Sequence, residues 1–205
     1  STGRPSNSFG GINFAALDAK KRKFIIPKNN MLVEFDYDAF HVRLVANLIG
    51  YTFPDGSVHD YLAKLYCVNR EEGKKLTFRY LYGGIPWDVI QLNPFFDLVN
   101  DLIEILWEEF TKTGKIETPI YKRPIFKKNY SNLTKTKLFN YYIQATETEQ
   151  NIKTIIELQR YLYMMKSNLI LYTYDSFLID FDKNDGIETL KKIRKILESD
   201  IYLTK

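Results

Sequence analysis

The stretch Met31–Gly50, MLVEFDYDAFHVRLVANLIG, joins an apolar strand-like run to a helix-like segment through an aspartate. A second apolar segment far along the chain, Leu169–Phe181 (LILYTYDSFLIDF), also delivers one aspartate beside an aromatic residue. At the tips of buried strands, the carboxylates of Asp36 and Asp175 can hold two divalent cations, which stabilise the attacking and leaving oxygens of a phosphoryl transfer. An aspartate at a strand end is more commonly a turn residue or a helix N-cap, so the residues between the two segments must decide.

The composition is that of a globular protein. The 205 residues suit one domain or two small ones, and 45% of them are hydrophobic against 26% charged. A net charge of +4 is mild, but positive charge gathers in Lys20–Lys23 (KKRK) and in Thr111–Lys137, which carries eight Lys and Arg against one Glu. Such runs are usually solvated surfaces, and they can also contact phosphate.

The single cysteine favours a reducing compartment, and the hydropathy predicts no membrane-spanning segment. Cys67 is the only cysteine, so the chain cannot form an internal disulfide. No run of about eighteen uncharged apolar residues is present to span a bilayer. We therefore expect a cytoplasmic protein without a membrane partner.

The order of the expected elements is strand, helices, strand, which indicates an α+β fold rather than a doubly wound sheet. Lys23–Ile26 and Met31–Phe35 are expected to form a hairpin that turns through Pro27–Asn30. Gly114–Ile125 is β-like, and Leu169–Phe181 is expected to form a second hairpin.

Helical spacing of apolar residues predicts the remaining elements. The expected helices cover Ala39–Leu48, Val58–Leu81, Pro94–Lys112, Glu147–Met165 and Ile187–Leu197. In the helix from Glu147, the apolar stripe is expected at Ile152, Ile155, Ile156 and Tyr163.

A second chemical pattern lies between the two aspartates. Arg70, Lys74, Phe78 and Tyr82 stand four residues apart, so on a helix they form one slowly drifting stripe. The two cations could bind a triphosphate and the two aromatic rings could stack on a base. The alternative is a surface helix whose long side chains only snorkel to water.

Seven short motifs occur in a fixed order along the chain. They are Thr2-Gly3-Arg4 with Ser6 and Ser8, Asp36-Tyr37 with Arg43-Leu44, Val58-His59, the stripe ending in Tyr82-Gly83, Gly114–Thr118 with Arg123, Asn140 with Gln144 and Thr146, and Tyr174-Asp175-Ser176. Together they resemble the palm and fingers of family A DNA polymerases, the group that contains bacterial polymerase I and many phage replicases. The resemblance covers nearly the whole chain.

The resemblance implies a polymerase palm, whose small antiparallel sheet carries the two aspartates, and a compact helical fingers subdomain. Residues 1–57 and 132–205 would form the palm, and residues 58–131 the fingers. The resemblance does not extend to the family's thumb and exonuclease domains. The chain is therefore expected to be either one piece of a split polymerase, with a separate chain supplying thumb or exonuclease, or a domain fragment. The bias toward Lys, Asn, Ile and Tyr fits an AT-rich genome such as a phage's, and a viral chain would work in the host cytoplasm.

The implied activity is template-directed DNA synthesis, in which a primer 3′-hydroxyl attacks a dNTP with the help of two Mg²⁺ ions. Asp36 and Asp175 would bind both ions, with the Tyr37 carbonyl as an extra ligand. Lys74 would complete the catalytic set.

The remaining implied roles concern the nucleotide and the DNA. The triphosphate would be held by His59, Arg70 and Lys74, and the sugar and base by His41, Phe78 and Tyr82. Primer–template DNA would contact Arg4, Asn13, Arg123, Asn140, Gln144 and Tyr174. In the minor groove the acceptor pattern is nearly the same for every base pair, so such contacts would read shape rather than sequence.

Two departures from the family pattern affect these expectations. His41 stands where the family has the glutamate that excludes ribonucleotides, so His41 is either the sugar gate or a residue that only packs in the palm. Tyr174 replaces the usual histidine before the second aspartate. Two alternative functions stay open: a non-catalytic nucleic-acid-binding remnant of a polymerase, and a single-subunit RNA polymerase.

Overall fold

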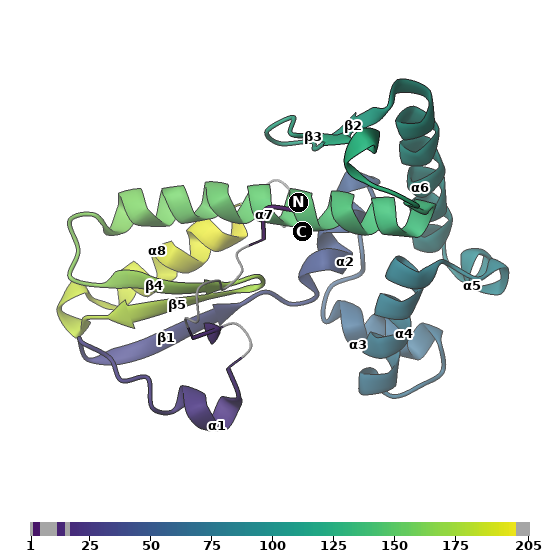
Figure 1. Ribbon diagram of the computed structural model, residues 1–205. Helices are drawn as coiled ribbons and strands as arrows, with labels where there is room; N and C mark the ends of the chain where they lie inside the picture. Colours follow the sequence, from purple (N-terminus) through teal and green to yellow (C-terminus); the bar gives the residue numbers. More distant parts are fainter. Residues whose placement is uncertain (1, 5–11, 15–16, 200–205) are drawn as a thin grey trace. The chain divides into compact units, whose positions relative to one another are not determined.

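The computed structural model describes residues 2–4, 12–14 and 17–199 (Figure 1). The chain divides into two compact units. The helical unit is essentially Asp38–Glu147, and the sheet unit combines Gly3–Tyr37 with Thr148–Thr204. The long helix α7 (Lys135–Leu162) contributes residues to both units.

The sheet unit is organised around β5 (Ser176–Phe181), which lies between β1 (Met31–Asp36) and β4 (Asn168–Thr173). Both pairings are antiparallel; β1 runs from Met31 opposite Phe181 to Asp36 opposite Ser176. Helix α8 (Ile187–Glu198) and the C-terminal part of α7 cover one face of this sheet (Figure 1). The mixed helix and sheet content confirms the α+β class.

The core of the sheet unit forms between the central strand and these two helices. Alternate side chains of β5 are directed to the same face, as the pleat of a strand requires. The buried cluster consists of Phe177, Ile179 and Phe181 from β5, Leu158 and Leu162 from α7, and Ile193 and Leu197 from α8. The expected hairpin over Leu169–Phe181 is confirmed by β4 and β5.

The expected strand over Lys23–Ile26 is wrong. The basic run instead forms the short helix α1 (Ala19–Arg22), whose N-cap Asp18 accepts a hydrogen bond from the Lys20 amide. The following loop is fastened by Asp180, a buried carboxylate of β5 that accepts from the amides of Lys28 and Asn29 at 3.1 Å each. With the loop held in this way, β1 pairs with β5 rather than with its neighbour in sequence.

The helical unit contains α2 to α6, a small hairpin and the start of α7. The elements are α2 (Phe40–Leu48), α3 (Val58–Leu65), α4 (Arg70–Gly83), α5 (Trp87–Leu92), α6 (Pro94–Thr113), β2 (Lys115–Glu117) and β3 (Pro124–Phe126). The expected helices over Ala39–Leu48 and Pro94–Lys112 are confirmed within a residue or two. Capping explains the ends of α6: Asn93 accepts from the Phe95 amide before this helix, and Gly114 follows it in the left-handed conformation.

The expected helical region over Val58–Leu81 consists of two helices, α3 and α4. The break comes where Cys67 takes a left-handed φ of 57° and Asn69 caps α4 by accepting from the Glu72 amide. The two helices then pack very closely, because a Cβ added at Gly73 would lie 2.7 Å from the Ala63 Cβ. A glycine is required at this contact.

The helix expected from Glu147 begins at Lys135 instead, and its apolar stripe is not its buried face. Of the expected stripe, Ile155 is partly buried and packs against the core of the sheet unit, but Ile152, Ile156 and Tyr163 are 43%, 40% and 83% exposed. From Asn151 to the end of the helix, the buried positions are Asn151, Thr154, Leu158 and Leu162. The first two are polar residues that hydrogen-bond inside the fold, which apolar periodicity cannot detect.

We expect Gly73→Ala to lower the free energy of unfolding by about 1–3 kcal/mol, because the added methyl group forces α3 and α4 apart. Gly83→Ala is the matched control on the same helix, since its nearest atom, Cγ of Arg79, lies 4.0 Å away. Urea unfolding followed by circular dichroism measures both changes. Equal stability of the two variants would contradict the close α3–α4 contact.

Candidate functional site

The two aspartates lie at the same end of the three-stranded sheet. β1 ends at Asp36, opposite Ser176, and the turn between β4 and β5 contains Tyr174 and Asp175. The backbone amide of Tyr37 donates to the Asp175 carbonyl oxygen at 3.0 Å. Asp36 and Asp175 are both exposed, so groups bound to them keep access to water.

Hydrogen bonds within the turn and from α7 hold the turn that carries Asp175. Tyr174 takes a left-handed φ of 58°, and the Asp175 amide donates to the Thr173 carbonyl at 2.7 Å. Asn151 of α7 donates to the Tyr174 carbonyl at 2.8 Å and to the Tyr172 hydroxyl at 2.8 Å. A left-handed non-glycine residue costs about 1–3 kcal/mol and persists where its surroundings fix it, as they do here.

The donor set at this sheet end suits Mg²⁺. It offers two carboxylates and neighbouring peptide carbonyls, including that of Tyr37, and Mg²⁺ prefers hard oxygen ligands while retaining several waters. Tyr37 itself is anchored, because its hydroxyl donates to the Leu197 carbonyl at 3.3 Å and its ring meets Phe177 edge-on at 5.8 Å. Within the described ranges no three His, Cys, Asp or Glu side chains gather as a closed metal cage.

Two of the residues expected to contact DNA meet beside the aspartates. The Arg4 guanidinium carbon lies 5.1 Å from the centre of the Tyr174 ring, in a cation–π contact. Asn13 is on the surface of the same unit.

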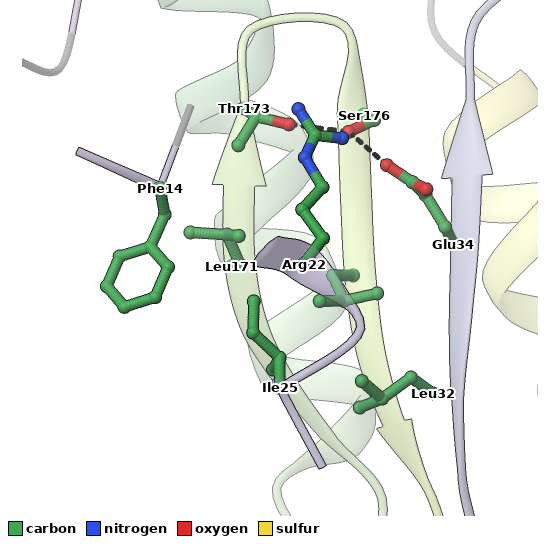
Figure 2. Close-up of a pocket in the computed structure, with 9 residues that line it drawn as sticks. Phe14, Arg22, Ile25, Leu32, Glu34, Leu171, Thr173 and Ser176 are labelled. Carbon is green, nitrogen blue, oxygen red and sulfur yellow. Dashed lines mark hydrogen bonds between the residues drawn. The ribbon is translucent and has the colours of Figure 1, made fainter. Parts of the chain in front are cut away.

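A pocket of about 150 Å³ opens on one face of the sheet and was not expected from the sequence (Figure 2). Its floor is apolar, and its polar end contains Ser176, whose hydroxyl donates to Glu34 at 3.0 Å and accepts from the Thr173 hydroxyl at 2.6 Å. The lining residues are Phe14, Arg22, Ile25, Leu32, Glu34, Leu171, Thr173, Ser176 and Leu178. Leu32, Glu34 and Asp36 alternate along β1, so the pocket shares a strand face with the first aspartate.

In the helical unit, α4 presents the expected stripe. Arg70 and Lys74 are exposed, whereas Phe78 and Tyr82 are half-buried and stacked, with ring centres 6.0 Å apart and planes 17° apart. The opposite side of α4 is buried through Gly73, Thr77 and Leu81. The structure therefore brings all four stripe residues to one accessible side of the helix.

Arg70 lies close to two acids. Its guanidinium nitrogens are 3.5 Å from an Asp60 oxygen and 4.0 Å from an Asp38 oxygen. Asp38 also pairs with Arg43 at 3.2 Å. The Arg70 side chain remains 53% exposed, so these are weak, exchangeable ion pairs.

His59 is buried beside these charges. It is 5% exposed, its ring centre lies 6.3 Å from that of Phe78, and its Nδ1 has no hydrogen-bond partner among the described residues. Burial lowers the pKa of His59; the negative charge of Asp38 opposes this shift, and the positive charges of Lys74 and Arg70 add to it. His59 is therefore neutral at pH 7.

The expected DNA-contacting residues of the helical unit are dispersed. Arg123 donates to the Thr2 carbonyl at 2.7 Å, and Asn140 donates to the Tyr82 carbonyl at 3.2 Å, which ties α7 to the end of α4. Gln144 is half-buried one turn after Asn140, on the same side of α7.

His41 of α2 stands against the aromatic pair of α4. Its Nδ1 is hydrogen-bonded to the Tyr82 hydroxyl, and its ring is nearly perpendicular to both Tyr82 and Phe78, at 88° and 79°. Its Nε2 lies 3.1 Å from an oxygen of Glu147, which is 1% exposed. Sequence reasoning missed Glu147, because the polar run Thr146–Asn151 has the pattern of a solvated helix face.

The α+β fold of this chain is similar to that of a polymerase domain. The polymerase domain of Pol1 from M. smegmatis, solved in complex with DNA primer–template and dNTP, is similar to this chain with a TM-score of 0.66 and 15% sequence identity. The similarity covers 83% of this chain, and the chain spans 37% of that structure. No family model matches the sequence, and none of the curated proteins does.

None of the helices in the described part of the chain has the length and apolar character needed to cross a membrane.

We expect His59 to titrate below the value of about 6.5 that is usual for histidine. Lys74→Ala should raise its pKa by removing a positive charge, and Asp38→Asn should lower it. Lys75→Ala is the matched control, because its side chain points about 100° away around the helix. NMR titration measures these shifts, and the His41→Gln variant assigns the signals, since the chain contains two histidines.

The same shift predicts a dependence of stability on pH. Because folding lowers the pKa of His59, its contribution to stability is complete above the unfolded value and is lost as the pH falls through the folded value. A His59 signal that titrates above 6.5 would contradict both expectations.

Proposed function

We propose that this chain carries out template-directed DNA synthesis as the catalytic part of a family A DNA polymerase of phage type. The observation that carries the proposal is the strand register that brings Asp36 and Asp175 to one end of a sheet. The likeness to a polymerase domain solved with primer–template and dNTP supports it. In this proposal residues 1–57 and 132–205 serve as the palm and residues 58–131 as the fingers.

Asp36, Asp175 and the Tyr37 carbonyl would hold two Mg²⁺ ions. When bound, such ions lower the pKa of a coordinated hydroxyl and neutralise the charge that develops on the leaving group. The primer 3′-hydroxyl attacks the α-phosphate of the dNTP, and pyrophosphate leaves. The exposure of both carboxylates leaves room for substrate oxygens and water.

The groups on α3 and α4 would bind the incoming nucleotide. Lys74 and Arg70 contact the triphosphate, and Arg70 exchanges its weak ion pairs with Asp60 and Asp38 for phosphate. His59 is neutral in the free protein, and an approaching triphosphate favours its protonated form. The stacked Phe78 and Tyr82 rings offer an apolar surface to the base and sugar, with His41 as the gate against ribose.

DNA contacts complete the proposal. Arg4 and Tyr174 adjoin the aspartates and would meet the primer end, while Asn13, Arg123, Asn140 and Gln144 would contact the duplex. A separate chain that supplies thumb or exonuclease functions would add phosphate contacts, which provide much of the affinity for DNA. We therefore propose weak, salt-sensitive DNA binding by this chain and distributive synthesis unless such a partner is present.

Primer extension with Mg²⁺ tests the proposal. Asp36→Asn and Asp175→Asn should each abolish extension and leave primer–template affinity nearly unchanged, because these carboxylates are needed for the ions rather than for the duplex. Asp101→Asn, which removes the same charge from the exposed side of α6, is the control. Extension near the wild-type rate in either variant would refute the metal assignment. DNA binding without extension by the wild-type chain, with or without candidate partner chains, would favour a non-catalytic binding protein.

Lys74→Ala should lower kcat/KM for dNTP on the order of 10- to 100-fold, because a hydrogen bond to a charged group contributes roughly 1.5–3 kcal/mol. Lys75→Ala should change it by less than about twofold, since a surface charge outside the contact contributes little. Steady-state single-nucleotide incorporation measures both variants. Similar losses in the two would mean that the stripe is not the nucleotide-binding side of α4.

A further inference from the structure

Glu147 is a carboxylate removed from water in the middle of α7. It is 1% exposed, and its Oε2 lies 3.1 Å from Nε2 of His41. An ionised carboxylate is retained in such a place only where a partner compensates for its lost hydration. The His41 imidazole is the partner that the geometry supplies, and the motifs of the sequence assign no role to Glu147.

The imidazole links Glu147 to Tyr82. Nε2 faces the carboxylate and Nδ1 is bonded to the Tyr82 hydroxyl, so side chains of α7, α2 and α4 form one continuous hydrogen-bonded chain. An ionised carboxylate can only accept, so Nε2 must carry a hydrogen. In neutral imidazole Nδ1 is then the acceptor, and the Tyr82 hydroxyl donates to it. Glu147 thereby fixes both the tautomer and the ring orientation of His41.

The fixed ring has a defined relation to the aromatic pair. Phe78 and Tyr82 are nearly parallel, and the imidazole stands edge-on to both, with ring centres 6.4 Å and 5.7 Å away. A nucleoside stacked on the two rings would be in steric contact with the imidazole on one side. A ring released from Glu147 could rotate about its side-chain bonds and open that side.

We propose that Glu147 is a positioning residue for sugar selection: through His41 and Tyr82 it closes the space that a ribose 2′-hydroxyl would occupy. This inference rests on the proposed polymerase function and on His41 as its gate. Selectivity then depends on a carboxylate of α7 that touches no substrate, and it acts through the imidazole.

The ratio of kcat/KM for dNTP to kcat/KM for the matching rNTP measures discrimination. His41→Ala should lower this ratio on the order of tenfold or more. Glu147→Gln keeps the volume and removes the charge, and it should lower the ratio about three- to tenfold while kcat/KM for dNTP changes less. The double variant should match His41→Ala alone, because Glu147 acts through His41. Glu149→Gln is the control, since it removes another buried carboxylate of α7 and should leave the ratio unchanged.

A pair of compensating substitutions provides a second readout. His41→Glu should impair incorporation of both sugars, because it sets a second carboxylate against buried Glu147, and adding Glu147→Gln should restore it. Nitrogen NMR of the imidazole should show His41 protonated at Nε2 in the wild type and a mixture of tautomers in Glu147→Gln.

The outcomes separate the two proposals. An active enzyme whose sugar ratio is unchanged in Glu147→Gln, or in which His41→Glu needs no second change, overturns the positioning role and leaves the polymerase intact. A chain that extends no primer under any condition refutes the polymerase function, and sugar selection by Glu147 is refuted with it.

Discussion

The pairing of β1 with β5 is the constraint on which the sheet unit depends. It joins residues separated by about 140 positions in sequence, as the contact between Ser176 and Glu34 shows. A shift of one residue in this pairing would turn every side chain to the opposite face and separate Asp36 from the Asp175 turn. The register is fixed from both ends: Asp180 binds the loop before β1, and the Tyr37 amide binds the Asp175 carbonyl after it. Burial of Phe177, Ile179 and Phe181 against α7 and α8 then makes any other register costly.

The molecule uses carboxylates in two opposite environments. Asp36 and Asp175 are exposed at a strand end and a turn, where they remain hydrated and available to ligands. Glu147 and Asp180 are buried, and each is committed to groups of the protein, an imidazole in the first case and backbone amides in the second. The exposed pair is suited to reversible binding of ligands, whereas the buried carboxylates orient other groups of the protein.

Sequence patterns correctly predicted the helices and strands whose formation depends mainly on neighbouring residues. The second hairpin, α2, α6 and the side of α4 that carries the stripe follow from alternation, helical spacing and capping residues, and the structure has them. The errors arose where a distant partner decides the outcome. Lys23–Ile26 does not pair with β1, because Asp180 binds the amides of the loop between them. In the C-terminal half of α7, Asn151 and Thr154 are buried because they hydrogen-bond inside the fold. Glu147 could not be found from sequence, since a buried glutamate and a solvated one look alike until its partner is known.

The ion pairs of Arg70 determine how much negative charge an anion needs in order to bind to this helix. A guanidinium already near Asp60 and Asp38 gains from a new anion only the difference between the new contact and the two it gives up. An anion with a single diffuse charge gains little by that exchange, whereas a polyphosphate presents enough charge to displace both acids. Displacement of Arg70 would leave Asp60 without this ion pair, whereas Asp38 would keep its pair with Arg43 at 3.2 Å, so the charge of Asp60 would oppose a bound anion most strongly.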